Sequence, residues 1–295
     1  MRWVGGVLLC LVIGLAILMP AGSAAIAADA WDCATVDAPG TATPVRVFSG
    51  TPVPIPEDGG GLTIFAAASL TDPFNEIKDS LEAEYPELTI TMSFAGSQTL
   101  VTQVAEGAPA DVLAVAATEP MDRALEEGVV ESSPFIFARN ELTVIVPNDN
   151  PAGIESAADL GEDGLRLVIA APEVPAGAYA RQSICLMAAE TGTYGQGFVE
   201  RVAANVVSEE NNVKSVLAKV ALGEAGAGIV YTSDVTDDVV AVTIPDEVNV
   251  VASYPIAPVI GGNEELARAF ISYVLSDAGQ DALADYGFLP VDRSE

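Results

Sequence analysis

Two serines in this sequence stand where a short apolar run gives way to a helical pattern. Ser69 lies in the stretch 63–70, and Ser97 lies in the stretch 94–100 directly after Gly96. A hydroxyl at the start of a helix is close to backbone N–H groups without an intrahelical acceptor, at the positive end of the helix dipole. Such places bind anions, although serine is also a common plain helix cap. The pair therefore suggests a clamp for a small oxyanion.

Three further places offer neutral hydrogen-bond donors at expected junctions of strand and helix. Ala176 follows Pro175, which presets the backbone for the first turn of a helix. Val213 follows asparagines that are typical helix caps, and Tyr231 ends an apolar strand with a phenol hydroxyl. Each also has a plainer interpretation as a cap, a turn or a core tyrosine. Their occurrence together favours one site built from neutral donors.

The composition excludes several kinds of chemistry. The 295 residues include no histidine, which removes Ser-His-Asp and Cys-His catalysis and every histidine-ligated metal site. A formal net charge of -30 makes nucleic acid and anionic lipid poor partners. Asp111 could be a catalytic carboxylate together with Glu106, but we expect it to enter a strand and bond local backbone. We therefore predict a protein that is not an enzyme and has no cofactor.

The N-terminus has the pattern of a targeting segment. Arg2 precedes an apolar run over 4–19, and the small residues Ala25 and Ala27 suit cleavage, so residues 1–27 are a signal peptide or a membrane anchor. The remaining chain is then exported, and Cys33 and Cys185 are the cysteines left outside the signal. Such a pair favours a disulfide. Two buried thiols or pairing with another molecule are the alternatives.

The elements that must position these groups begin after an extension rich in Pro, Thr and Gly over 28–61. From residue 62 onward, strand and helix patterns alternate, which predicts an α/β protein of parallel type with its ligand at the carboxyl ends of the strands. We expect strands at 62–66, 88–94, 112–116, 142–146, 165–170, 226–231 and 248–258. We expect helices at 72–85, 98–106, 121–127, 175–187, 213–222, 264–275 and 279–286.

The ordered set of segments resembles the molybdate-binding protein family of high-affinity ABC importers. The first matches read Ala-Ala-Ala-Ser-Leu-Thr at 66–71 and Phe-Ala-Gly-Ser at 94–97. Further matching segments are 107–112, 174–180, 212–213, 223–234 and 286–288. The resemblance covers about 62–290.

The resemblance implies a two-lobe fold of the type II periplasmic binding proteins, with a cleft between the lobes. Lobe 1 would hold 62–140 and 254–295, and lobe 2 would hold 141–253. It implies that Ser69, Ser97, Ala176, Val213 and Tyr231 bind molybdate or tungstate as neutral donors. It further implies a monomer on the periplasmic or extracellular face, with or without a membrane anchor, that delivers the anion to an ABC permease.

Two alternatives stay open at this point. The same fold could bind another oxyanion such as sulfate, or it could be a surface scaffold without a transport role. Glu209 and Glu210 stand close to the proposed donor Val213, and we expect them to point outward or cap. The segment 113–117 lacks the polar residues that relatives often carry, and the extension 28–61 has no counterpart in the compact family pattern.

Overall fold

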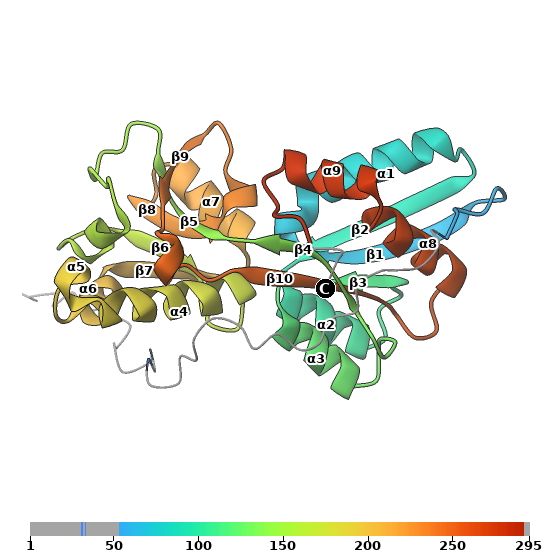
Figure 1. The fold of residues 1–295 in the computed structure, drawn as a ribbon, viewed down its shortest axis with the longest axis horizontal. Coiled ribbons are helices and arrows are strands. Elements are labelled where there is room, and N and C mark those ends of the chain that lie inside the picture. The colour runs from blue at the N-terminus through green and yellow to red at the C-terminus, as the bar shows by residue number, and fades with distance from the viewer. Residues whose placement is uncertain (1–30, 32, 34–52, 292–295) are drawn as a thin grey trace, which may run out of the picture.

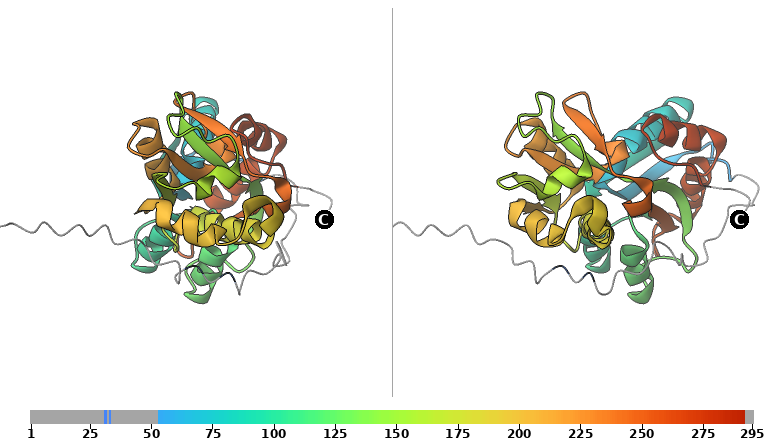
Figure 2. Two further views of the ribbon diagram at one scale, coloured as in Figure 1. Left: turned by 90° about the vertical axis from the view of Figure 1, so that its left-hand side faces the viewer. Right: turned by 60° about the vertical axis from the view of Figure 1, so that its left-hand side comes forward.

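The chain folds into two units that lie side by side, each a five-stranded sheet with helices on both faces (Figures 1 and 2). The computed structural model describes Trp31, Cys33 and residues 53–291. The predicted signal peptide or anchor at 1–27 lies outside these residues. Within the part of the chain that the structure describes, no helix has the length and apolar character needed to span a membrane.

The first sheet has the strand order β2-β1-β3-β10-β4. Its strands are β1 (Gly60–Ala67), β2 (Leu88–Ala95), β3 (Val112–Ala114), β4 (Phe135–Asn140) and β10 (Ala252–Pro258). Its helices are η3 (Ala68–Leu70), α1 (Thr71–Glu84), α2 (Ser97–Ala105), α3 (Thr118–Glu126), α8 (Glu264–Val274) and α9 (Asp277–Asp285). Figure 1 shows α1, α8 and α9 over one face of the sheet, with α2 and α3 under the other.

The second sheet has the strand order β7-β6-β8-β5-β9. Its strands are β5 (Leu142–Pro147), β6 (Leu167–Ala170), β7 (Val206–Glu210), β8 (Ala227–Tyr231) and β9 (Val239–Thr243). Its α-helices are α4 (Pro175–Ala189), α5 (Thr191–Tyr194), α6 (Phe198–Asn205) and α7 (Val213–Ala221). The 3₁₀-helices are η4 (Ala157–Gly161), η5 (Thr232–Asp234) and η6 (Asp246–Val248).

Both sheets are mixed, whereas the sequence predicted a parallel type. β1 runs parallel to β2 and β3, and β6 runs parallel to β7 and β8. β10 is antiparallel to β3 and β4, and β5 is antiparallel to β8 and β9. β5 is the first strand after the chain leaves the first sheet, and β10 is the first strand after it leaves the second sheet. The chain therefore passes between the sheets at Glu141 and again between β9 and β10.

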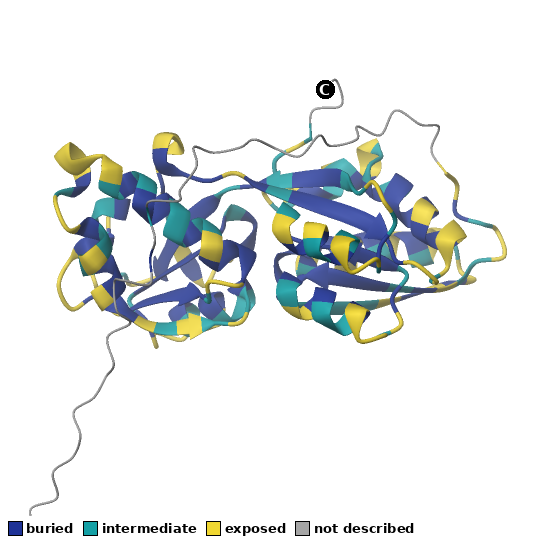
Figure 3. Ribbon diagram, turned by 90° about the horizontal axis from the view of Figure 1, so that it is seen from below, coloured by how far each residue is buried: buried dark blue, intermediate teal, exposed yellow. Residues whose placement is uncertain are grey.

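The predicted alternation of strands and helices is confirmed, but β4, β7 and β9 were not expected. β7 ends in Glu209 and Glu210, so it lacks the continuous apolar pattern that marks a buried strand. β9 is a short apolar run over Val239–Thr243, and the structure leaves most of it partly or fully exposed. The central strands are buried between the helix layers, as their dark blue colour in Figure 3 shows. Phe74 of α1 packs against Phe137 and Phe270 with ring centroids 5.7 Å apart in both pairs.

The described part of the N-terminal extension contacts both units. Cys33 forms a disulfide with Cys185 of α4, their Cα atoms being 5.4 Å apart. Trp31 is buried, and the guanidinium of Arg181 lies 5.4 Å from its ring centroid. At the other end, the Val53 N–H donates to the Ser272 hydroxyl of α8 over 2.8 Å. The extension is therefore attached to α4 by a covalent bond and to α8 by backbone contacts.

Candidate functional site

The structure brings all five residues of the predicted donor set to one small cavity between the two sheets. Its volume is about 10 Å³, a space on the scale of one water-sized group. Besides the five, it is lined by Ala67, Ala68, Ala95, Gly96, Ala116, Val174, Pro175 and Asn212. No charged side chain is among the described residues of this lining. The cavity thus has no room for a sugar or an amino acid.

Helix starts surround this cavity. Ser69 lies in η3 just before α1, Ser97 is the first residue of α2, Ala176 is the second of α4, and Val213 is the first of α7. Backbone N–H groups in a first helical turn have no intrahelical acceptor and carry the positive end of the dipole. The sequence forms these starts locally, through Pro175 in α4 and through Asn212, whose side chain caps α7. The backbone therefore surrounds the cavity with partial positive charge.

The Ser97 hydroxyl keeps its proton available to the cavity. The side chain is buried, and the backbone N–H of Ala116 donates to its Oγ over 3.1 Å. Since a backbone N–H can only donate, Oγ uses a lone pair in this bond and keeps its own proton free. That proton is then available to an acceptor in the cavity.

The buried Tyr231 hydroxyl makes no hydrogen bond of ordinary geometry among the described residues, although it interacts with the Tyr254 hydroxyl. A buried polar group without such a bond is costly, and native proteins rarely keep one without a reason. Burial raises the pKa of the Tyr231 phenol well above its ordinary value, so the phenol keeps its proton. A buried donor that lines the cavity and lacks such a bond indicates that an acceptor belongs there.

Glu209 and Glu210 do not line the cavity. Glu209 forms an ion pair with Arg181, and Glu210 forms one with Lys219 and accepts a hydrogen bond from Ser208. These partners hold both carboxylates away from the helix start at Val213, as expected from the sequence. Repulsion between a carboxylate and a bound anion is thereby avoided.

Asp111 has a structural role whose partners the sequence did not predict. Its two carboxylate oxygens accept the backbone N–H groups of Thr63 and Asn263, each over 2.6 Å. The expectation that it bonds backbone is confirmed, but the expectation of local partners is wrong, because they lie 48 and 152 positions away. The carboxylate joins β1 to the start of α8.

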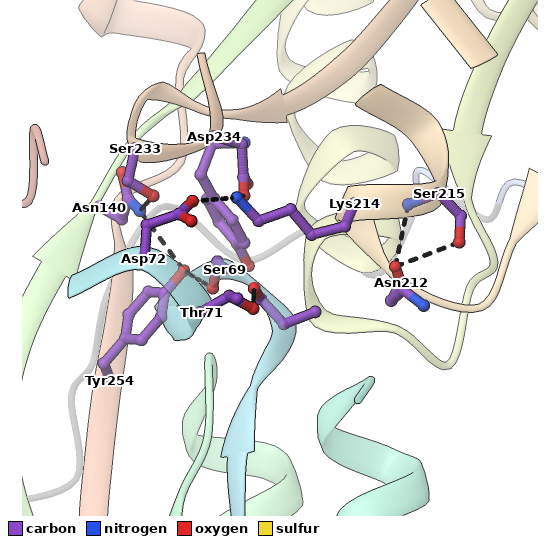
Figure 4. Close-up of polar contacts among 12 residues, drawn as sticks. Ser69, Thr71, Asp72, Asn140, Asn212, Lys214, Ser215, Ser233, Asp234 and Tyr254 are labelled. Atoms are coloured by element: carbon purple, nitrogen blue, oxygen red, sulfur yellow. Dashed lines mark hydrogen bonds and ion pairs between the residues drawn. The ribbon is translucent and has the colours of Figure 1, made fainter. Parts of the chain in front are cut away.

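A charged trio beside the cavity was missed in the sequence (Figure 4). Lys214 Nζ lies 2.6 Å from the Asp72 carboxylate of α1 and 3.7 Å from the buried Asp234 carboxylate of η5. Asp234 also accepts the Tyr231 backbone N–H over 3.3 Å. The only local signal is that a cation at the first turn of α7 opposes the helix dipole, which calls for a compensating partner. Among the described residues, Lys214–Asp72 is the one ion pair that joins the two units.

Burial raises the pKa of Asp234 to about 6 in spite of the Lys214 charge, which gives a testable pH dependence. Because the folded pKa exceeds the ordinary value of 3.8, the folded state binds an extra proton between about pH 4 and pH 6. The contribution of Asp234 to the free energy of unfolding should therefore fall, by about 3 kcal/mol in total, as pH rises through this window.

Urea unfolding of the wild type and Asp234→Asn at several pH values between 4.5 and 7.5 checks this sign. The variant should gain stability relative to the wild type as the pH rises. The exposed Asp163→Asn variant is the matched control and should follow the wild type. A difference between wild type and Asp234→Asn that stays constant across this range would contradict the assignment.

Two α/β units that meet at a cavity lined by donors define a solute-binding protein of the periplasmic type. The family model for bacterial extracellular solute-binding proteins matches residues 62–289. The molybdate-binding protein ModA of Mycobacterium tuberculosis is 37% identical over 231 residues, which cover 77% of this chain and 84% of that protein. The chain therefore belongs to the molybdate-binding protein ModA family of bacterial extracellular solute-binding proteins.

Solved structures share the fold. The Azotobacter vinelandii periplasmic molybdate-binding protein matches with a TM-score of 0.67 and 16% identity, over 78% of this chain and all of that one. The sulfate-binding protein SubI from Mycobacterium tuberculosis matches with a TM-score of 0.68 and 20% identity, over 79% of this chain and 87% of that one. Because these two proteins are named for different anions, the fold alone does not select the ligand.

Proposed function

We propose that this exported protein captures molybdate or tungstate in the cavity between its units and delivers the anion to an ABC permease. The observation that carries the proposal is the lining itself, which combines helix starts and hydroxyl donors with no charged side chain. A fully deprotonated tetrahedral dianion offers acceptors only, and each donor of this lining can meet one. Ser69, Ser97 and Tyr231 supply hydroxyls, and Ala176 and Val213 supply backbone N–H groups.

The local dipoles must act against the field of the whole protein, whose formal net charge is -30. Salt screens exposed charges over about 10 Å at 0.1 M, so the distant carboxylates lose most of their influence at the cavity. Hydrogen bonds to a charged acceptor in a buried site are the strong ones. Binding is then governed by the donors that touch the anion.

Selectivity follows from the same lining. A protonated phosphate must donate its own proton, and a site made of donors leaves that proton without an acceptor. Sulfate has the same charge and shape as molybdate, so cavity size has to separate these two anions. Sulfate is the alternative ligand, because it offers the same number of acceptors in the same geometry. The identity to M. tuberculosis ModA favours molybdate.

The division into lobes is part of this proposal. Lobe 1 comprises 62–140 and 254–295, and lobe 2 comprises 141–253, which is supported by the membership of the strands in two sheets. An anion in the cavity contacts both lobes and favours the closed arrangement, because only this arrangement offers both sets of donors. We expect a monomer that acts at the outer face of the membrane, in the periplasm or extracellular space.

Thermal unfolding of the purified protein with micromolar molybdate, tungstate, sulfate and phosphate tests the proposal. An anion present at 1,000 times its dissociation constant should stabilise the fold by ~4 kcal/mol, a shift on the order of 10 °C. Perrhenate is a tetrahedral monoanion of similar size and serves as the matched probe for charge. We expect shifts with molybdate and tungstate, and a much smaller one with perrhenate.

The other outcomes separate the alternatives. An equal or larger shift with sulfate would keep the site and change the ligand to sulfate. A shift with phosphate would contradict the argument from a lining of donors. No shift with any anion would overturn the proposal and favour a surface scaffold without a transport role.

A further inference from the structure

A lysine at the edge of the ligand cavity has two acidic partners, one in each unit. Lys214 is the second residue of α7, and its Nζ lies 2.6 Å from Oδ2 of Asp72, which stands in the first turn of α1. The same Nζ lies 3.7 Å from Oδ1 of Asp234, in η5 of its own unit. Figure 4 shows the lysine side chain reaching from α7 toward both carboxylates. The cation therefore connects the two units and keeps a partner in its own.

The two carboxylates differ in what else holds them. The Asp72 side chain is 48% exposed. Asp234 is fully buried, and its Oδ2 accepts the Tyr231 backbone N–H over 3.3 Å. Its Oδ1 makes no hydrogen bond of ordinary geometry among the described residues. Because a buried carboxylate oxygen in this state is costly, Asp234 stays ready to take the lysine when Asp72 is withdrawn.

The ion pair between the units lies beside groups that line the cavity. Asp72 lies three positions after Ser69, and Lys214 directly follows Val213. Among the described residues it is the one ion pair that joins the two units. A contact at this point draws Val213 toward Ser69, across the gap that a bound anion would bridge.

We infer that Lys214 is a positioning residue for closure of the lobes, which exchanges Asp234 in the open arrangement for Asp72 in the closed one. This inference rests on the proposed function, because it concerns closure around the proposed anion. On opening, Asp72 leaves with its own lobe and Lys214 keeps Asp234, so the cation is not left unpaired. A partly exposed ion pair stabilises an arrangement only weakly, so it favours closure without holding the empty protein shut. The anion supplies the rest by binding donors of both lobes.

The sign of one substitution separates this role from a general effect of charge. Asp72→Asn removes a negative charge beside the cavity of a protein whose formal net charge is -30. If the carboxylate acted only through its field, its loss would strengthen the binding of an anion. Loss of a closure contact should instead weaken molybdate binding, by roughly two- to fivefold for a partly exposed ion pair. Asp72 is half-exposed, so the variant should fold.

Calorimetry with molybdate at pH 8 measures this sign in the wild type, Asp72→Asn and Glu265→Gln. Glu265 is an exposed carboxylate in the first turn of α8, in the same unit as Asp72. Glu265→Gln is therefore the matched control and should bind molybdate as the wild type does. Both substitutions remove one negative charge from the first turn of a helix, so loss of the contact with Lys214 distinguishes them.

Variants that also carry Lys214→Met isolate the part of the lysine, because this change removes the charge and keeps the aliphatic stem. In this background, Asp72→Asn should no longer weaken molybdate binding, since the pair is already absent. Asp234→Asn removes the partner of the open arrangement. It should strengthen binding roughly two- to fivefold when Lys214 is present, and by a smaller factor in the Lys214→Met background.

Two results would overturn the inference. One is a molybdate affinity of Asp72→Asn that equals or exceeds that of the wild type. The other is an equal effect of each aspartate substitution with and without the charge of Lys214, which would leave the lysine no part in closure. A wild type that binds no molybdate would contradict the proposed function itself, so the two failures are distinguishable.

Discussion

Replacing Gly96 with alanine should weaken molybdate binding more than a hundredfold and leave the stability of the ligand-free protein nearly unchanged. Gly96 precedes α2, and a Cβ built on it would lie 2.5 Å from the backbone carbonyl oxygen of Asn211, in the other lobe. A side-chain carbon cannot come so close to a backbone oxygen, so the lobes of the variant could not reach the closed arrangement. An open cleft presents only half of the donors to the anion.

Calorimetry with molybdate and small-angle scattering with and without the anion check this result. The variant should show a weakened dissociation constant and no compaction upon addition of molybdate. Gly61→Ala is the matched control, because Gly61 lies in β1 of the same sheet and nothing lies within 4 Å of its Cβ position. An affinity of Gly96→Ala within threefold of the wild type would contradict the assignment of this glycine to lobe closure.

Replacing Tyr231 with phenylalanine should reduce molybdate affinity by roughly 10- to 100-fold without loss of stability. The phenol is a buried donor without a hydrogen bond of ordinary geometry in the described part of the protein, so its removal costs no such bond in the ligand-free state. With the anion present, the same change removes a hydrogen bond to a charged acceptor, which contributes about 1.5–3 kcal/mol. The substitution should therefore keep or raise the unfolding temperature of the ligand-free protein. It should reduce the rise in unfolding temperature that molybdate causes.

Thermal unfolding and calorimetry of Tyr231→Phe separate these effects. The ligand-free variant should unfold at the temperature of the wild type or above it, and the shift caused by molybdate should shrink by several degrees. Because the ring is retained, the contact with Tyr254 at 5.7 Å between centroids should persist. Loss of stability in the ligand-free variant, together with full affinity, would show that the hydroxyl has a structural partner instead.

These two predictions concern different properties of one cavity. Gly96 acts on the approach of the lobes, and Tyr231 acts on the number of donors, so the two residues act through separate steps.

The sequence by itself determined the local features of the site. Pro175 and Asn212 start their helices through contacts within the first turn, and the signals for these starts need only a few neighbouring residues. The absence of histidine and the resemblance to the molybdate-binding family also needed no structure. The same local patterns predicted most of the strands and helices, and they failed for β4, β7 and β9, whose apolar patterns are short or mixed.

Only the tertiary structure decided which distant groups lie beside these donors. The bond between Ser69 and Tyr254 joins residues 185 positions apart, and the ion pair between Lys214 and Asp72 joins residues 142 positions apart. Asn140 carried no local signal in the sequence, and the structure makes it a buried amide bonded to Glu141, Thr232 and Ser233. No periodicity marks such contacts, because they arise where elements far apart in the sequence meet, as α1 meets α7 and η3 meets β10. Local chemistry therefore specified the donors, and the fold decided their neighbours and their enclosure.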